Sequence, residues 1–447
     1  MRFILATLLL ILPAEAFAKP LVTTSEQSLI SICTDYADTH ERLLQICAAA
    51  LDGPGLTNRK RAEVLTAYAD ALAWLDRLDE ARERYEAALK ADPFFAAAQE
   101  GLGWVHWLEK DYAAATAAFQ AALDLSPSSD ALGGLASAQF KADAIDAEEA
   151  ITLFDAALAI EPNNRWVWRQ KGWMLMREET FEAAREAFQA AVDLNDQDAE
   201  ALEGLSLAHY HLDEDEAALT HINAAIAAAP STPGYVQRRS MVLLALDRPA
   251  AALRDADAYL EERPEAAIGY VRKGRALDAL GRTKEALEVM SEAHGRLPRD
   301  DTLDYWYAMT LSDDGRHGEA WDVMSYYMHQ GSGDFWDYVL LAFLAVKTDR
   351  LDAASDAVGN LQRLRAEDHY THYWAAVTKV YAGDVDGAER QIRRALDQGL
   401  SDSMLGDFVE HMVGQGYYIR AAAFRLNLKQ EHLLQDDTSD QNAAVNE

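Results

Sequence analysis

Residues 165–196, RWVWRQKGWMLMREETFEAAREAFQAAVDLND, contain the pattern that decides the fold. Ala184, Phe188 and Ala191 are spaced i, i+4 and i+7, so they share one face of a helix. Gly172 lies twelve residues before Ala184, where a small residue lets two helix backbones approach closely. The stretch therefore predicts two short helices that pack against each other.

The same pattern recurs along most of the chain. Alanines follow one another at a step of 34 residues, with a single step of 35 between Ala115 and Ala150. The alanines of this ladder are Ala81, Ala115, Ala150, Ala184, Ala218, Ala252, Ala286, Ala320, Ala354 and Ala388. Prolines, which cannot continue a helix, close the units at Pro93, Pro127, Pro162, Pro230, Pro264 and Pro298. A fixed period of this length predicts stacked repeats that bury one continuous core.

The pattern resembles the tetratricopeptide repeat family, whose 34-residue unit has the form W-x2-L-G-x2-Y…A-x3-F-x2-A…P. Residues 165–196 match it at Trp168, Gly172, Leu175, Ala184, Phe188 and Ala191, with Asp196 in place of the proline. Residues 96–127 match at Leu102, Gly103, Ala115, Phe119, Ala122 and Pro127. The resemblance implies an all-α, right-handed superhelical solenoid of about ten helix-turn-helix repeats over residues 62–400. Units eight to ten lack the closing proline.

The N-terminus predicts export. Arg2, the apolar run from Phe3 to Leu12 and the small-x-small site Ala16-Phe17-Ala18 form the pattern of a secretory signal peptide over residues 1–18. The run is shorter than the roughly 20 apolar residues that span a bilayer, so we expect no membrane insertion after cleavage. We therefore expect a periplasmic or secreted protein.

Cys33 and Cys47 are the two cysteines of the chain. An even count in an exported chain favours a disulfide, which requires a turn between them; a catalytic or metal-binding thiol pair is the alternative. We expect the pair within an N-terminal helical segment, residues 19–61. Beyond the repeats we expect C-terminal capping helices over 401–435, broken at Gly416, and a disordered acidic tail over 436–447.

Composition and motifs argue against an enzyme. The net charge of −33 disfavours nucleic acid and anionic lipid as partners. His369 and His372 could share a helix face, but no second pair of metal ligands accompanies them. Asp384-Val385-Asp386-Gly387 has the start of a calcium loop without its closing glutamate. No nucleophile, acid and base converge, so we expect no catalytic residues, no metal and no cofactor.

The side of each first helix that faces away from the repeat packing is rich in large residues. In the family this side lines a concave groove that holds peptide segments. Six of the ten tryptophans fall there, and so many aromatics on a solvent-facing side indicate an interaction surface. The predicted partner-binding residues are Trp74, Trp104, Trp107, Trp166, Trp173, Met176, Tyr210, Met241, Tyr305, Met309, Trp336, Phe343, Tyr370, Tyr373 and Tyr381.

The sequence therefore predicts a non-catalytic exported scaffold that binds a protein or peptide segment in this groove, as an adaptor or assembly factor of the cell envelope. A glycan-binding scaffold in polysaccharide export or cell-wall handling is the alternative. The groove could instead be occupied by the chain itself, or its tryptophans could pack on one another. If they face solvent, substituting Trp104 or Trp107 by alanine should leave folding nearly intact.

Overall fold

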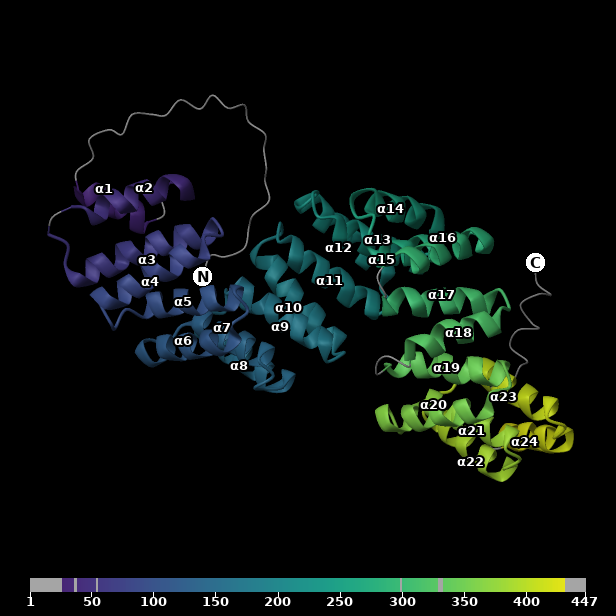
Figure 1. Cartoon of the computed structure of the whole chain (residues 1–447). Helices are drawn as coiled ribbons and strands as arrows, with labels where there is room; N and C mark the ends of the chain where they lie inside the picture. Colours follow the sequence, from purple (N-terminus) through teal and green to yellow (C-terminus); the bar gives the residue numbers. More distant parts are fainter. Residues whose placement is uncertain (1–25, 36–37, 54, 298–299, 329–332, 431–447) are drawn as a thin grey trace, which may run out of the picture. The chain divides into compact units, whose positions relative to one another are not determined.

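The computed structural model describes residues 26–35, 38–53, 55–297, 300–328 and 333–430. Within these residues every regular element is a helix, α1 to α24 (Figure 1). The predicted signal peptide and disordered tail lie outside the described residues. The chain divides into two compact units, an N-terminal unit up to Leu246 and a C-terminal unit from Asp247, which are described separately.

The N-terminal unit contains thirteen helices in its described residues. They are α1 (Glu26–Thr34), α2 (His40–Leu51), α3 (Asn58–Trp74), α4 (Leu78–Ala91), α5 (Ala96–Leu108), α6 (Tyr112–Leu125), α7 (Ser129–Lys141), α8 (Ala147–Ile160), α9 (Arg165–Arg177), α10 (Phe181–Leu194), α11 (Ala199–His211), α12 (Asp215–Ala228) and α13 (Pro233–Ala245).

The described part of the C-terminal unit contains eleven more. They are α14 (Pro249–Glu262), α15 (Ala267–Ala279), α16 (Thr283–Arg296), α17 (Asp301–Asp313), α18 (His317–Met328), α19 (Phe335–Lys347), α20 (Leu351–Leu364), α21 (His369–Tyr381), α22 (Val385–Asp397), α23 (Asp402–Gly414) and α24 (Tyr418–Gln430).

The alanine ladder forms the packed seam of the helix pairs. All ten alanines lie on second helices, α4 to α22, and each is 0% exposed. Phe188 of α10 shows why small residues face this seam. A Cβ atom added at Gly172 of α9 or at Gly204 of α11 would come within 2.7 and 2.3 Å of its ring. The expected all-α solenoid of helix pairs is confirmed.

The turn inside each pair has a repeated backbone conformation. A residue with positive φ lies five positions before each ladder alanine, or seven before Ala150. It is aspartate in five of the repeats and glycine in three, residue types that tolerate the left-handed region, with Lys110 and Glu179 in the other two. Gly416 and the buried Ala421 repeat this relation in α23 and α24, so the C-terminal helices have the same pair geometry.

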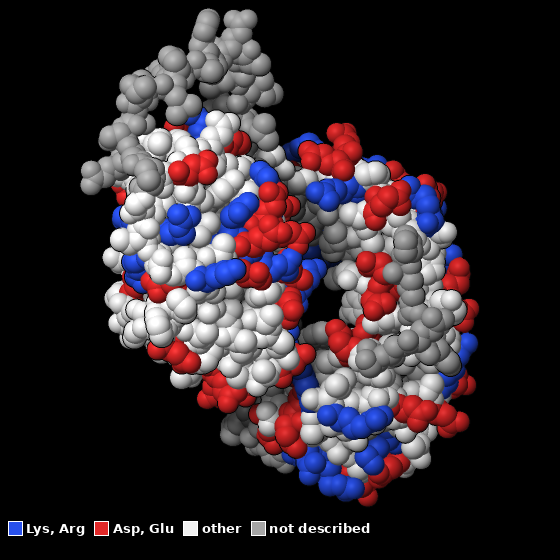
Figure 2. Space-filling model, turned by 60° about the vertical axis from the view of Figure 1, so that its left-hand side comes forward, with Lys and Arg blue, Asp and Glu red and all other residues white. Residues whose placement is uncertain are grey.

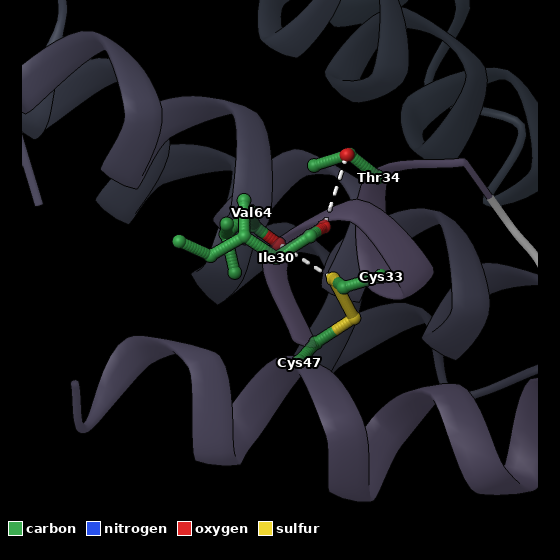
Figure 3. The surroundings of a disulfide bond; sticks show 5 residues. All are labelled: Ile30, Cys33, Thr34, Cys47 and Val64. Carbon is green, nitrogen blue, oxygen red and sulfur yellow. Dashed lines mark hydrogen bonds between the residues drawn. A yellow bond between two sulfur atoms is a disulfide. The ribbon is translucent and has the colours of Figure 1, made fainter. Parts of the chain in front are cut away.

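A disulfide joins α1 to α2, as the paired cysteines predict. The Cα atoms of Cys33 and Cys47 are 5.2 Å apart, and both residues are fully buried (Figure 3). Cys33 Sγ lies 3.8 Å from the carbonyl oxygen of Val64 on α3, so the bridge is packed against the first repeat. The two short helices thus cover the open end of the array.

The surface carries both signs of charge in spite of the acidic balance. Figure 2 shows one face on which Lys and Arg side chains are interspersed with Asp and Glu. None of the described helices is long and apolar enough to cross a membrane.

Candidate functional site

The structure divides the predicted groove residues into two groups. In the N-terminal unit, Trp104 and Trp107 of α5 and Trp166 of α9 pack on one another. The ring centroids of Trp104 lie 6.2 Å from Trp107 and 4.7 Å from Trp166. Trp104 also contacts Phe119 edge-on at 5.0 Å, and Trp107 Nε1 donates a hydrogen bond to Ser137. These rings therefore form a self-packed cluster.

A glycine on the intervening helix allows the cluster to form. Gly133 lies on α7, between α5 and α9, and a Cβ atom there would come within 3.0 Å of the Trp166 ring. Because Gly133 has no side chain, Trp166 passes over α7 and reaches Trp104. The expected solvent exposure is wrong for Trp104, which is 8% exposed, and for Tyr373 of α21, which is 4% exposed.

The other predicted residues of the N-terminal unit do not join one surface. Trp74 stacks on His40 of α2, Trp173 contacts Phe188, and Tyr210 contacts His211 edge-on. Met176 packs at the edge of the hydrophobic core around Phe188. These side chains are half-buried against their own or the neighbouring helices. The sequence pattern alone does not distinguish such positions from free groove positions.

In the C-terminal unit three aromatic side chains form a partly exposed row, which we call the aromatic row: Tyr305 of α17, Trp336 of α19 and Tyr370 of α21. Trp336 is 44% exposed, and its ring lies 5.1 Å from that of Tyr370. Trp336 and Tyr305 line one pocket of about 380 Å³, together with Trp306, Tyr327 and the carboxylates of Asp301, Asp334 and Asp337. The row therefore borders a real concavity.

The floor of this pocket is a fixed carboxylate. Asp337 is buried, and its Oδ2 accepts hydrogen bonds from the Tyr327 hydroxyl and the backbone N–H of Asp334, both at 2.8 Å. Burial raises the pKa of Asp337 above its ordinary value, in spite of these two bonds. Burial, with the neighbouring Asp337 and Asp334, also raises the pKa of Tyr305. The pocket is thus acidic and hydrogen-bonded at its base and aromatic at its rim.

A second pocket, of about 440 Å³, lies among α19, α21 and α23; we call it the α21 pocket. Its walls include the predicted residues Phe343, Tyr373 and Tyr381. They also include seven residues that were not predicted: Lys347, Trp374, Met404, Asp407, Glu410, His411 and Gly414. Five of these belong to α23, which was assigned only a capping role. The continued turn pattern at Gly416 was the signal that α23 is a further first helix.

A hydrogen bond between Tyr381 and His411 and several shifted pKa values characterise the α21 pocket. The Tyr381 hydroxyl lies 3.1 Å from His411 Nδ1. Burial lowers the pKa of His411, and Lys347 lowers it further, while Asp407 and Glu410 act in the opposite direction. His411 is therefore neutral at neutral pH, and its Nδ1 and the Tyr381 hydroxyl share one hydrogen bond whose direction depends on the imidazole tautomer. Burial and the nearby Asp407 raise the pKa of Tyr373.

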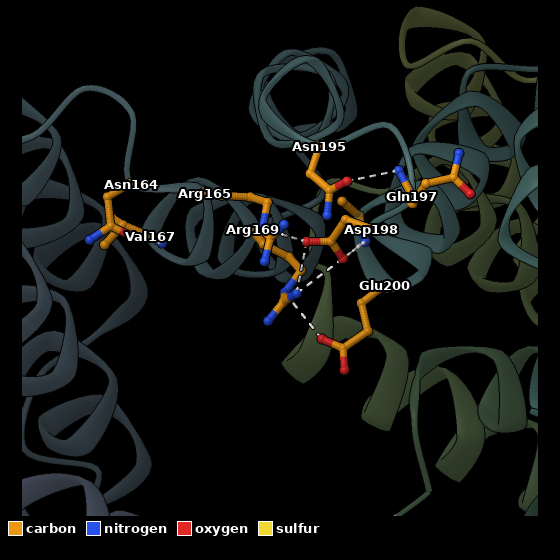
Figure 4. A network of polar contacts seen from close by, with 9 residues as sticks. Asn164, Arg165, Val167, Arg169, Asn195, Gln197, Asp198 and Glu200 are labelled. Carbon is orange, nitrogen blue, oxygen red and sulfur yellow. Dashed lines mark hydrogen bonds and ion pairs between the residues drawn. The ribbon is translucent and has the colours of Figure 1, made fainter. Parts of the chain in front are cut away.

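A buried ion-pair network between α9 and α11 is structural. Arg169 of α9 and Asp198, the residue that caps α11, are almost fully buried, and Nη1 of Arg169 lies 3.1 Å from both Asp198 carboxylate oxygens (Figure 4). Arg165 contacts the same carboxylate at 3.0 Å, and Arg169 Nε lies 3.1 Å from Glu200. The network ties two successive first helices together, and its central pair, Arg169 and Asp198, is shielded from solvent.

The motifs considered for metal have other partners. His372 Nδ1 lies 2.9 Å from Gln391 Oε1, and His369 packs against Tyr370. Asp384 caps α22 by accepting the N–H of Gly387. Among the described residues, no three His, Cys, Asp or Glu side chains come close enough together to hold a metal ion.

Comparison with known families agrees with the helix-pair geometry. The tetratricopeptide repeat model matches residues 66–130, 169–233 and 238–301. This chain is a tetratricopeptide repeat protein. No curated protein sequence matches it.

Among solved structures, that of yeast Tom70 supports the same fold. The structure of yeast Tom70 is similar over 90% of this chain and 96% of its own, with 12% identity and a TM-score of 0.51. A tetratricopeptide repeat protein from Parabacteroides merdae is similar over 56% of this chain and 99% of its own, with 17% identity and a TM-score of 0.41. Identities this low bear on the fold alone.

Proposed function

We propose that this tetratricopeptide repeat protein is an exported, non-catalytic scaffold that holds a segment of a partner protein on the aromatic row. It would act as an adaptor or assembly factor in the cell envelope. The observation that carries the proposal is the row itself, which comes from three successive first helices: Tyr305 and Trp336 line one pocket, and Tyr370 packs against Trp336. Rigid aromatic side chains around a pocket are the usual anchors of protein interfaces.

The chemistry of the row indicates the kind of segment that fits. Its rings offer apolar contact, while the carboxylates of the adjoining pocket favour a hydrogen-bond donor or a cation. A segment with an apolar side chain beside a lysine or arginine would satisfy both. The tetratricopeptide fold itself supports binding of proteins.

Two observations support export. The first eighteen residues have the pattern of a signal peptide, and the buried Cys33–Cys47 disulfide is of a kind that persists in oxidising compartments. N-terminal sequencing of the protein purified from its own cells tests this directly. We expect the mature chain to begin at Lys19, and a chain that still begins at Met1 would contradict export by this route.

Photo-cross-linking tests the partner site. A photoreactive phenylalanine analogue at position 370 should give a discrete protein adduct in cells, and Trp336→Ala should reduce its yield severalfold. The matched control places the analogue at Phe94, an aromatic residue that is 75% exposed in the N-terminal unit. Equal adducts from positions 370 and 94, or an adduct insensitive to Trp336→Ala, would refute binding at the row.

A further inference from the structure

The α21 pocket has a chemistry different from that of the aromatic row. We propose that it is a separate binding site for a neutral carbohydrate, which it would hold by one or two sugar rings of an oligosaccharide. The carbohydrate site would include Phe343, Tyr373 and Tyr381, which then do not belong to the protein-binding surface. This site does not depend on the function proposed for the row.

The walls suit a sugar ring. Phe343 and Tyr381 are half-buried and line the pocket, with Met404 on the facing helix α23. Behind them Trp374 contacts Phe343 at 6.1 Å and Tyr373 at 5.0 Å, edge-on in both cases, which fixes the rings in place. A pyranose has an apolar C–H face that packs on such rings, and a pocket of about 440 Å³ is of ordinary size for a small ligand.

Charged groups of both signs line the same pocket. Lys347 lies over the ring of Phe343 at 5.5 Å, and among the described residues no carboxylate pairs with its ammonium group. Asp407 and Glu410 on α23 likewise have no cationic partner among those residues. All three line the same pocket as His411, which places them around one site. These three residues are exposed, so the pocket presents hydrated donors and acceptors that a ligand can take over from solvent.

This mixture selects for a neutral ligand with many hydroxyl groups. An anionic ligand would meet Asp407 and Glu410, and a cationic ligand would meet Lys347, so either would face a like charge. A sugar hydroxyl can donate to a carboxylate and accept from an ammonium group at the same time. A neutral oligosaccharide can therefore hydrogen-bond to groups of both signs and brings no like charge near either of them.

A buried donor adds a second requirement. Trp374 is 5% exposed, and its Nε1–H has no hydrogen-bond partner among the described residues. A buried donor without an acceptor is costly, so a shift of the neighbouring rings that let a ligand oxygen or a bridging water reach this shielded atom would recover that free energy. Nε2 of His411, the ring nitrogen that does not contact Tyr381, is a further polar group that donates or accepts according to the tautomer. Sugar hydroxyl groups can pair with it in either case, because a hydroxyl both donates and accepts.

The test titrates the full mature chain with three neutral probes, maltotetraose, cellotetraose and tetra-N-acetylchitotetraose, using calorimetry and tryptophan fluorescence. We expect at least one to bind, and Asp407→Asn to weaken it about tenfold, since a hydrogen bond to a charged group is lost. Trp374→Phe keeps the ring packing and removes the donor, and it should also weaken binding. Asp402→Asn, an exposed carboxylate at the start of the same helix and outside the pocket, is the matched control.

Circular dichroism melting curves establish that each variant is folded. Absence of binding by all three sugars at millimolar concentration would overturn the proposal, as would binding that Asp407→Asn and Trp374→Phe leave unchanged. A neutral tetrapeptide that binds with the same sensitivity, while the sugars do not, would show the pocket to be a peptide site. Cross-linking from position 370 is read independently, so the two proposals can fail separately.

Discussion

The self-packed tryptophan cluster makes a quantitative prediction for Trp104→Ala. The side chain is 8% exposed and contacts the rings of Trp107, Phe119 and Trp166. Truncation of a buried tryptophan costs about 3–5 kcal/mol, because the apolar contacts are lost and a cavity remains. Trp104→Phe should cost less than about 1.5 kcal/mol, since it keeps a ring and the lost Nε1–H has no partner among the described residues.

Repeat arrays seldom unfold as one cooperative unit, so the assay must be local. Hydrogen exchange read in α5, α7 and α9 reports the free energy of opening around the cluster, and urea unfolding followed by circular dichroism gives the overall effect. Trp336→Ala is the control, because a 44% exposed ring should change stability by only about 0.5 kcal/mol. A cost below about 1 kcal/mol for Trp104→Ala would refute the packing argument and restore Trp104 as a free groove residue.

Three further perturbations follow from buried groups. Arg169→Ala leaves the Asp198 carboxylate with less charge compensation, so chemical denaturation should show a loss of about 3–5 kcal/mol, whereas a double variant that also has Asp198→Asn should lose less. Reduction of Cys33–Cys47, or its replacement by two alanines, should cost about 3 kcal/mol and increase exchange first in α1 and α2; unchanged exchange there would contradict a stabilising role. Burial lowers the pKa of His411, so the unfolded chain binds the proton first as the pH falls below about 6.5. Wild-type stability should therefore decline relative to His411→Gln between pH 7 and 5, and parallel pH profiles would count against this.

The sequence predicted the framework of the fold well, for a physical reason. A ladder alanine is constrained by two helix backbones at once, so its spacing recurs wherever the same pair geometry recurs. All ten alanines proved fully buried. The paired cysteines were equally constrained, because two residues that far apart in sequence can be bridged only across a turn. For the ladder alanines and for the cysteine pair alike, the contacts that restrict the residue lie within one pair of helices. Such contacts leave a regular spacing that can be read from the sequence.

The groove residues were less predictable because their environment depends on helices two repeats away. Helical spacing placed Trp104 on the unpacked side of α5, and within that pair of helices the placement is reasonable. Its burial comes from Trp166 of α9, which reaches it only because Gly133 on α7 has no side chain. The α23 wall of the α21 pocket was missed for a different reason. The alanine on the second helix of that pair, Ala421, comes 33 residues after Ala388 rather than 34, so the pair falls outside the strict ladder.

The aromatic side chains pack together in the tryptophan cluster but line a cavity in the α21 pocket. The difference follows from the residue on the first helix that lies between the two flanking first helices. Gly133 on α7 leaves a gap that the tryptophans of α5 and α9 close, so no pocket remains there. On α21 the corresponding part of the helix carries Tyr373 and Trp374, whose rings stand between Phe343 of α19 and the residues of α23. Large rings at this position hold the flanking helices' side chains apart and leave a lined pocket. Whether an aromatic side chain in this array packs or lines a pocket is thus decided by its neighbour's size.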